Sequence, residues 1–203
     1  RVIRRELRIR PGDTFRRSFV ERSVREVQQL NFFNSVDVGL EPDEESLEID
    51  LTLKVEEKST GTASVGAGYS ERDKLVGTIA LQIPNFLGNG QQLDFQWEFG
   101  TRRETFRLGF TEPWLLNTPT SLSGSLFRDT QRFFGDFDQR AQGASIRVGR
   151  RLNRLDYTSV TLGYGISAVK FINFLDSTTV DSRRQTSLRD NVTSSLNANI
   201  TRN

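Results

Sequence analysis

A period of two runs through most of the chain and constrains its fold more than any other feature. From Thr60 onward, segments of about ten residues carry apolar side chains at every second position, with turns between them. In the segment from Gln91 to Thr101, the apolar positions are Leu93, Phe95, Trp97 and Phe99. Because successive side chains of a strand point to opposite faces, each segment has one apolar and one polar face. Repetition at a length of about 9 to 11 residues predicts antiparallel strands of a transmembrane β-barrel.

The composition agrees with this prediction. Only 35% of the residues are hydrophobic and the mean hydropathy is -0.50. Lipid meets only alternate residues of a barrel strand, so the average hydropathy of a barrel stays close to that of a soluble protein. The net charge is +2, with 28 basic residues scattered among 26 acidic ones. No continuous basic stripe is present, so nucleic acid is not an expected partner.

The chain lacks Cys, His and Met. Without Cys and His it has no thiolate nucleophile, no Ser-His-Asp triad and no ordinary zinc site. The motifs G-x-S-x-G, G-x-x-x-x-G-K and H-E-x-x-H are also missing. We therefore expect a protein that is not an enzyme and needs no metal or cofactor. The lack of Met predicts that the chain is a piece of a longer polypeptide.

Residues 1–58 follow a different pattern and predict a small α+β domain of the order strand-helix-strand-strand. Val2 to Ile9 alternates as a short strand, and helical spacing follows from about Phe15 to Leu30. Ser18 and Glu21 have the spacing of a capping box at the start of that helix. A hairpin then turns at the acidic residues 41–45 and returns along an edge strand that contains Leu47, Ile49, Leu51 and Leu53.

Residues 59–203 predict about eight barrel strands and no further helix. The expected ranges are 60–69, 74–83, a hairpin on each side of Arg102-Arg103, 120–128, 143–152, 158–169 and 190–201. In that hairpin, opposing charges and aromatic pairs favour Phe99 opposite Phe106 and Glu98 opposite Arg107. The five prolines, at positions 11, 42, 84, 113 and 119, are expected outside the strand interiors.

The connections predict how the barrel lies in a membrane. Two long polar loops, 129–142 and 170–189, fall on the side away from the small domain, as the outer loops of a barrel would. Phe86, Trp114 and Tyr157 fall on the opposite side. Trp and Tyr prefer the membrane interface because the ring is apolar and its edge is polar. The three aromatic residues at this boundary are the predicted rim anchors.

Three segments carry a family resemblance. Residues 30–38, Leu-Asn-Phe-Phe-Asn-Ser-Val-Asp-Val, resemble the L-G-F-F-x-x-V segment of a polypeptide-transport-associated (POTRA) domain. Residues 85–90 and 111–116 resemble the first two periplasmic turns of the barrel in the BamA family of outer-membrane assembly factors. Asn31 replaces the usual Gly before the Phe pair, and Asn also enters left-handed conformations. The resemblance implies a last POTRA domain followed by about half of a sixteen-stranded barrel.

The resemblance also implies a function. The family folds and inserts β-barrel clients into the bacterial outer membrane, with the POTRA domain in the periplasm. Its first barrel strand forms a seam at which a client strand pairs, which here singles out Gly61, Ala63, Val65, Gly66, Gly68 and Tyr69. Glycines inside a strand weaken its pairing, although they could instead only let the barrel curve. The lumenal charges Asp94, Glu98 and Arg107 could line a passage or form ordinary ion pairs.

The expected partners are unfolded outer-membrane β-barrel clients, periplasmic chaperones, accessory assembly lipoproteins and the lipid bilayer. Two alternatives remain open from the sequence. One is a transporter of the same superfamily, of the two-partner secretion or translocation type, which would pass polypeptide through the lumen. The other is a small structural barrel of eight strands with a periplasmic anchor domain.

Overall fold

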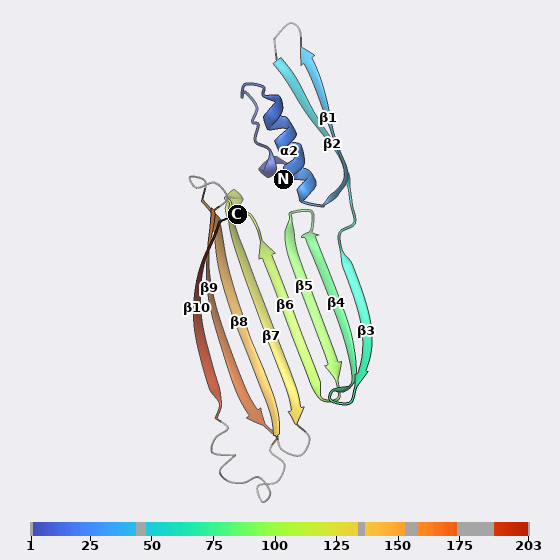
Figure 1. Ribbon diagram of the computed structural model, residues 1–203, viewed down its shortest axis with the longest axis vertical. Coiled ribbons are helices and arrows are strands. Elements are labelled where there is room, and N and C mark those ends of the chain that lie inside the picture. The colour runs from blue at the N-terminus through green and yellow to red at the C-terminus, as the bar shows by residue number, and fades with distance from the viewer. Residues whose placement is uncertain (1, 44–47, 134–136, 153–157, 174–188, 203) are drawn as a thin grey trace, which may run out of the picture. The chain divides into compact units, whose positions relative to one another are not determined.

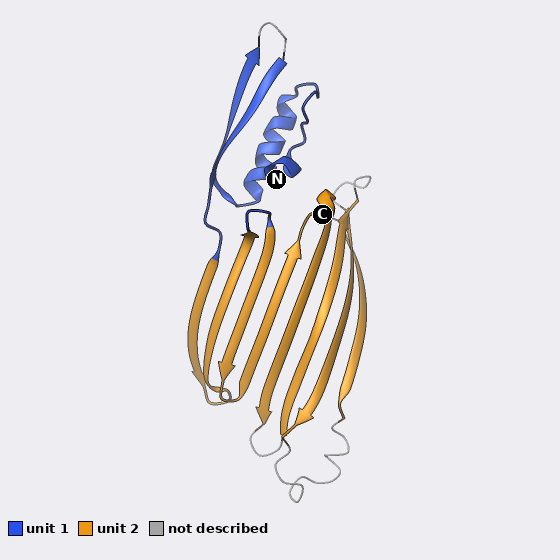
Figure 2. Cartoon of the chain, turned by 180° about the vertical axis from the view of Figure 1, so that it is seen from behind, with its two compact units in different colours: residues 1–61, 87–90 blue, residues 62–86, 91–203 orange. Residues whose placement is uncertain are grey.

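The computed structural model describes residues 2–43, 48–133, 137–152, 158–173 and 189–202. The chain forms two compact units, which Figure 2 distinguishes by colour. Unit 1 comprises Arg1–Gly61 and the turn Leu87–Gly90, and unit 2 comprises Thr62–Phe86 and Gln91–Asn203. The predicted boundary at residue 58 lies close to the observed one. Among the described residues, no helix is long and apolar enough to cross a membrane.

Unit 1 contains two helices and one hairpin. The elements are α1 (Val2–Glu6), α2 (Arg17–Gln29), β1 (Phe33–Asp43) and β2 (Glu48–Glu57). β1 and β2 pair antiparallel and form a two-stranded sheet (Figure 1). Val20, Ser23 and Val27 recur at helical spacing and are the buried residues of α2. The predicted helix and hairpin are therefore confirmed.

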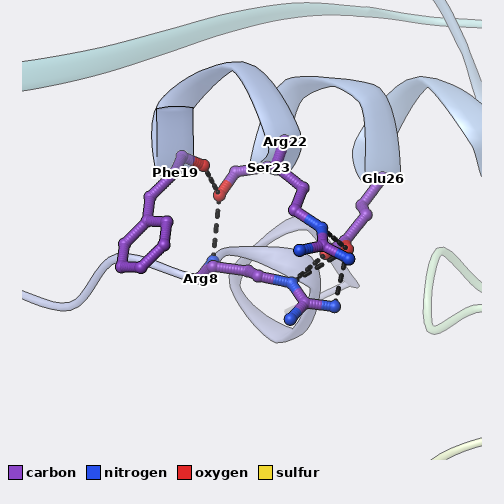
Figure 3. A network of polar contacts seen from close by, with 5 residues as sticks. All are labelled: Arg8, Phe19, Arg22, Ser23 and Glu26. Atoms are coloured by element: carbon purple, nitrogen blue, oxygen red, sulfur yellow. Dashed lines mark hydrogen bonds and ion pairs between the residues drawn. The ribbon is translucent and has the colours of Figure 1, made fainter. Parts of the chain in front are cut away.

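The predicted strand from Val2 to Ile9 is wrong, because Val2–Glu6 is helical and the residues after it dock on α2. The backbone N–H of Arg8 donates to Ser23 Oγ at 2.9 Å, and that hydroxyl donates to the carbonyl of Phe19 at 2.8 Å (Figure 3). The Arg8 guanidinium also binds the Glu26 carboxylate at 2.8 Å. The backbone N–H of Arg8 is therefore bonded to α2 and is not available for pairing as a third strand of the sheet.

The predicted capping box is also wrong. The N-cap position is Arg16, whose side chain makes no capping hydrogen bond. Ser18 lies inside the first turn, and Glu21 instead pairs with Arg17 one turn earlier, at 2.9 Å. Such an exposed pair at spacing i, i+4 contributes only about 0.3–0.5 kcal/mol, so α2 depends mainly on packing of its buried face.

Unit 2 is one sheet of eight antiparallel strands, each paired with its neighbour in sequence (Figure 1). The strands are β3 (Thr62–Ser70), β4 (Lys74–Phe86), β5 (Gln91–Gly100), β6 (Arg103–Glu112), β7 (Thr120–Phe133), β8 (Phe137–Arg151), β9 (Thr158–Ile172) and β10 (Asn191–Arg202). A short 3-10 helix, η1 (Leu115–Asn117), follows β6. All eight predicted strands are confirmed, and β3 and β10 lie at opposite edges of an open sheet.

The predicted register of the β5–β6 hairpin is wrong by two residues. Phe99 lies opposite Glu104 rather than Phe106, and Phe106 lies opposite Trp97. Only Thr101 and Arg102 separate the two strands, so the turn is tighter than the charge pairing suggests. A slip of two residues leaves every side chain on its predicted face.

The charge pairs of the predicted register change with it. Glu98 lies 3.6 Å from Arg103 rather than beside Arg107. Arg107 instead approaches Asp129 of β7 at 3.4 Å. Both pairs are ordinary ion pairs between strands, as the less specific interpretation of these charges expects.

The predicted polar loop 129–142 is wrong as well, because it is mostly strand. β7 continues to Phe133 and β8 begins at Phe137, in unbroken register from Asp129 opposite Ala141. Polar residues here continue the ladder beyond the apolar segment. Two prolines also lie within strands: Pro42 near the end of β1, and Pro84 in β4 at a register irregularity between Ile83 and Phe86. A bulge and a strand end both tolerate a missing N–H.

Candidate strand-pairing edge

The two faces of unit 2 differ in chemistry. We call the face that carries Phe95 and Leu126 the outer face. Apart from Phe133, every strongly exposed large apolar side chain in the strands of the described sheet lies on this outer face. The inner face borders an open hollow of about 640 Å³ whose polar lining includes Ser64, Gln82, Asp94, Gln96, Arg107 and Asp129. This division is the one expected for a barrel wall with a wet interior.

β3 forms an edge of the sheet. It pairs with β4 from Thr62 opposite Gln82 to Ser70 opposite Lys74, and in the described part of the chain it has no strand on its other side. Every residue of β3 is exposed, including Val65 at 82% and Tyr69 at 70%. An edge strand presents unpaired N–H and C=O groups, which can pair with another strand.

The side chains between β3 and β4 pair poorly in the middle of the ladder. Gly66 lies opposite Thr78, Ala67 opposite Gly77, and Gly68 opposite Val76. Cross-strand side-chain contacts supply much of the stability of a sheet, and a glycine removes the contact at its pair. These three successive pairs therefore rely on backbone hydrogen bonds with little side-chain contact.

Space does not force glycine at the two positions on β3. A Cβ built at Gly66 or Gly68 would meet no atom within 4 Å. Both glycines point to the inner face, on which Ser64 also lies, while Ala63 and Val65 flank them on the outer face. The small side-chain contact along this strand thus follows from its residue types and not from crowding. Gly61, also predicted as part of the seam, precedes β3 and belongs to unit 1.

The predicted second edge lies in unit 1. β2 pairs with β1 from Glu48 to Glu57, and within the described residues it has no other neighbour. Ile49 is 39% exposed, whereas Leu51 and Leu53 are half-buried on alternate positions. Leu47 lies outside the described residues. The two edges are in separate units, so the structure does not join them into one site.

Two of the predicted rim anchors, Phe86 and Trp114, lie at the near end of the sheet, defined as the end at which β3 begins. Phe86 ends β4, and Trp114 precedes η1, with its backbone N–H donating to Glu112 Oε1 at 2.9 Å. Tyr157 lies outside the described residues. Sequence reasoning missed Leu116, which is 87% exposed with φ 53° in the turn after β6. The adjacent Pro113 and Pro119 marked that turn, but not which apolar side chain would point outward.

Comparisons with known proteins agree with this architecture. A family model described as the Omp85 superfamily domain matches residues 85–203, and a POTRA model described as a surface antigen variable number repeat matches residues 1–58. A solved structure of BamA from Haemophilus ducreyi lacking POTRA domains 1–3 has a TM-score of 0.70 and 21% identity. The match covers 98% of this chain and 40% of that one.

Curated relatives match parts of the chain at low identity. Outer membrane protein assembly factor BamA of Nitratidesulfovibrio vulgaris is 28% identical over 86% of this chain and 22% of its own length. Sorting and assembly machinery component 50 homolog of Mus musculus is 30% identical over 52% of this chain and 23% of its own. The chain thus spans about a fifth of these two relatives. The family model covers more than half of the chain, and the sheet has the fold of the solved BamA structure. The chain therefore belongs to the Omp85 superfamily.

Proposed function

We propose that this chain is the strand-pairing part of an outer-membrane protein assembly factor, which folds β-barrel clients and inserts them into the membrane. Unit 2 is an outer-membrane barrel segment and unit 1 is a periplasmic POTRA domain. The single observation that carries the proposal is β3, an exposed edge strand whose central pairs with β4 have little side-chain contact.

The physical need for such an edge comes from the bilayer. Lipid offers no hydrogen-bond partners, so a client strand cannot enter it with bare N–H and C=O groups. The free edge of β3 supplies partners for one side of an incoming strand, as in β-augmentation. Further client strands then pair with one another, and the folding of the client drives the process without a nucleotide.

Unit 1 has a place in this proposal as the part that receives clients in the periplasm. The free edge of β2, with Ile49 exposed, can pair with an unfolded strand or with an accessory lipoprotein. Periplasmic chaperones would release clients at this edge.

The two rival functions differ in what they require of the sheet. A small structural barrel of eight strands would close by pairing β3 with β10. In the described sheet these two strands lie at opposite edges and do not pair with each other. A secretion transporter of the same superfamily would pass polypeptide along the inner face. Asp94, Arg107 and Asp129 line the hollow there, so this rival remains the second candidate.

Site-specific crosslinking of the full-length protein tests the proposal. The 203 residues contain no Cys, so a V65C variant places one thiol of this segment on the edge strand. A matched F95C variant places it on the same outer face of β5, which has a neighbour on each side. We expect V65C to form a disulfide with a Cys-bearing stalled client, and F95C to form none above background. Equal yields at both positions would contradict a pairing role for β3.

A further variant separates insertion from transport. An S125C variant places a thiol on the inner face of β7, beside the hollow. A client that enters the membrane along β3 crosslinks to V65C and not to S125C. The reverse pattern would instead support passage through the lumen.

A further inference from the structure

The outer face of β7, β8 and β9 becomes basic directly beyond its apolar belt, at the far end of the sheet. On β7, the outward positions Leu122, Gly124 and Leu126 are followed by Arg128. The register places Arg140 and Lys170 on the same face. We call Arg128, Arg140 and Lys170 the basic cluster. The sequence pattern assigned most of this region to loops, so the cluster was not predicted.

The strand register brings these three cations together. Arg140 of β8 lies directly opposite Lys170 of β9, and like charges at opposed positions destabilise a sheet. Thr130 lies opposite Arg140 on the other side, so Arg128, two residues away, is a diagonal neighbour. Diagonal neighbours are within reach of long side chains. The three cations can therefore contact one anion that lies between them.

The carboxylates near the basic cluster make their closest described contacts with other residues. Glu104 approaches Arg132 at 3.9 Å, Asp138 accepts a hydrogen bond from Asn173 at 2.7 Å, and Asp129 pairs with Arg107 on the inner face. Within the described ranges, no carboxylate forms an ion pair with any member of the cluster. The Nε atom of Arg140 is also buried with no hydrogen-bond partner there. A buried donor normally has a partner, so the Nε–H of this guanidinium lacks an acceptor among the described residues.

The position of the basic cluster on the sheet indicates which kind of anion would accept hydrogen bonds from it. Leu126 and Arg128 are two residues apart on one strand, about 7 Å along it, so the charges begin where the apolar belt ends. That boundary is the level of lipid headgroups, where basic side chains on a barrel cost little. Guanidinium groups bind phosphate oxygens through paired, charge-assisted hydrogen bonds. We propose that the basic cluster binds the phosphate of a lipid headgroup in the leaflet at the far end.

Native mass spectrometry of the full-length protein in detergent tests this binding. The probe is dioleoyl phosphatidic acid, which carries a phosphate monoester, and dioleoyl phosphatidylcholine serves as the zwitterionic comparison. The test variant is R128Q/K170Q, because both side chains are exposed and their loss leaves the ladder intact. The control, R147Q/R151Q, removes the same charge from exposed side chains on the inner face of β8, at the near end.

We expect the test variant to bind phosphatidic acid about tenfold more weakly than the parent, because two charge-assisted contacts are lost. The control should bind it as the parent does, and phosphatidylcholine should not distinguish the variants. Equal loss in both variants would overturn the proposal, since a general charge effect would then suffice. Displacement of the lipid by inorganic phosphate at equal concentration would also overturn it, because the site would then bind free phosphate.

A second variant keeps the test independent of folding. R140K retains the charge in the ladder but removes the fork of the guanidinium and its buried Nε. We expect it to bind phosphatidic acid more weakly than the parent while its strand register is unchanged. Binding equal to the parent's would show that Arg140 does not contact the phosphate and would remove the central cation from the proposed site.

Discussion

The ring of Phe99 on β5 covers Gly77, the residue directly opposite it on β4. A Cβ at Gly77 would lie 2.6 Å from Phe99 Cζ and 2.7 Å from Cε2, which is closer than real Cβ atoms approach. Glycine therefore leaves room for the tip of the aromatic ring beside the neighbouring strand on the outer face. The same glycine removes a side-chain contact from the adjacent β3–β4 pair, in which it lies opposite Ala67.

Gly77→Ala should therefore displace the Phe99 ring and destabilise the sheet by about 1–3 kcal/mol, the usual cost of overpacking. Gly124→Ala is the matched control, because a Cβ there meets nothing within 4 Å. Equilibrium urea unfolding of the full-length protein in detergent measures both changes. A Gly77→Ala variant as stable as the control would mean that the ring moves aside freely.

Adding side chains to β3 should strengthen its pairing with β4. Gly66→Val places a branched side chain opposite Thr78, in open space, and should stabilise the pair by about 1 kcal/mol. Hydrogen exchange of the β3 amides should slow, and client insertion into liposomes should slow with it. Gly124→Val changes a strand with two neighbours and should leave the β3 amides as they are. If exchange slows but client insertion is unchanged, weak pairing of β3 is not needed for insertion, which would contradict the proposed role of this strand.

Loss of the Ser23 hydroxyl should loosen the segment that follows α1. Ser23→Ala removes the hydroxyl that accepts the N–H of Arg8, and the loss of such a part-buried hydrogen bond costs about 0.5–1.5 kcal/mol. Ser18→Ala on the same helix is the control, because Ser18 is exposed and outside this network. Hydrogen exchange at the Arg8 amide should accelerate only in the first variant, and equal protection in both would contradict the role given to Ser23.

The ion pair between Arg107 and Asp129 should contribute little to stability. Its side chains are 46% and 35% exposed, and the closest approach of their charged atoms is 3.4 Å. Partly exposed pairs of this kind contribute about 0.2–1 kcal/mol. A double-mutant cycle with R107Q and D129N, followed by urea unfolding, measures the coupling. A coupling well above 1 kcal/mol would show a pair shielded from solvent and would favour a structural role within the lumen.

Much of this protein follows from its sequence, because the signals concerned are local. Alternation with period two identifies all eight barrel strands and predicts which face each side chain occupies. These faces are correct even in the β5–β6 hairpin, because its register differs from the predicted one by an even number of residues. Helical spacing around Val20 and Val27 identifies α2. The segments around Phe32 and Trp114 pointed to the family that the comparisons then showed.

The tertiary structure decided what depends on partners far apart in the chain. Val2–Glu6 is a helix and not a strand because the following residues bond to α2, and neither alternation nor length reveals that choice. The β5–β6 register follows the tight turn, because backbone geometry at Thr101 and Arg102 outweighs weak surface charge pairs. The polar stretch after Leu126 remains strand because β8 continues to pair with it, and only that pairing gathers Arg128, Arg140 and Lys170 on one face.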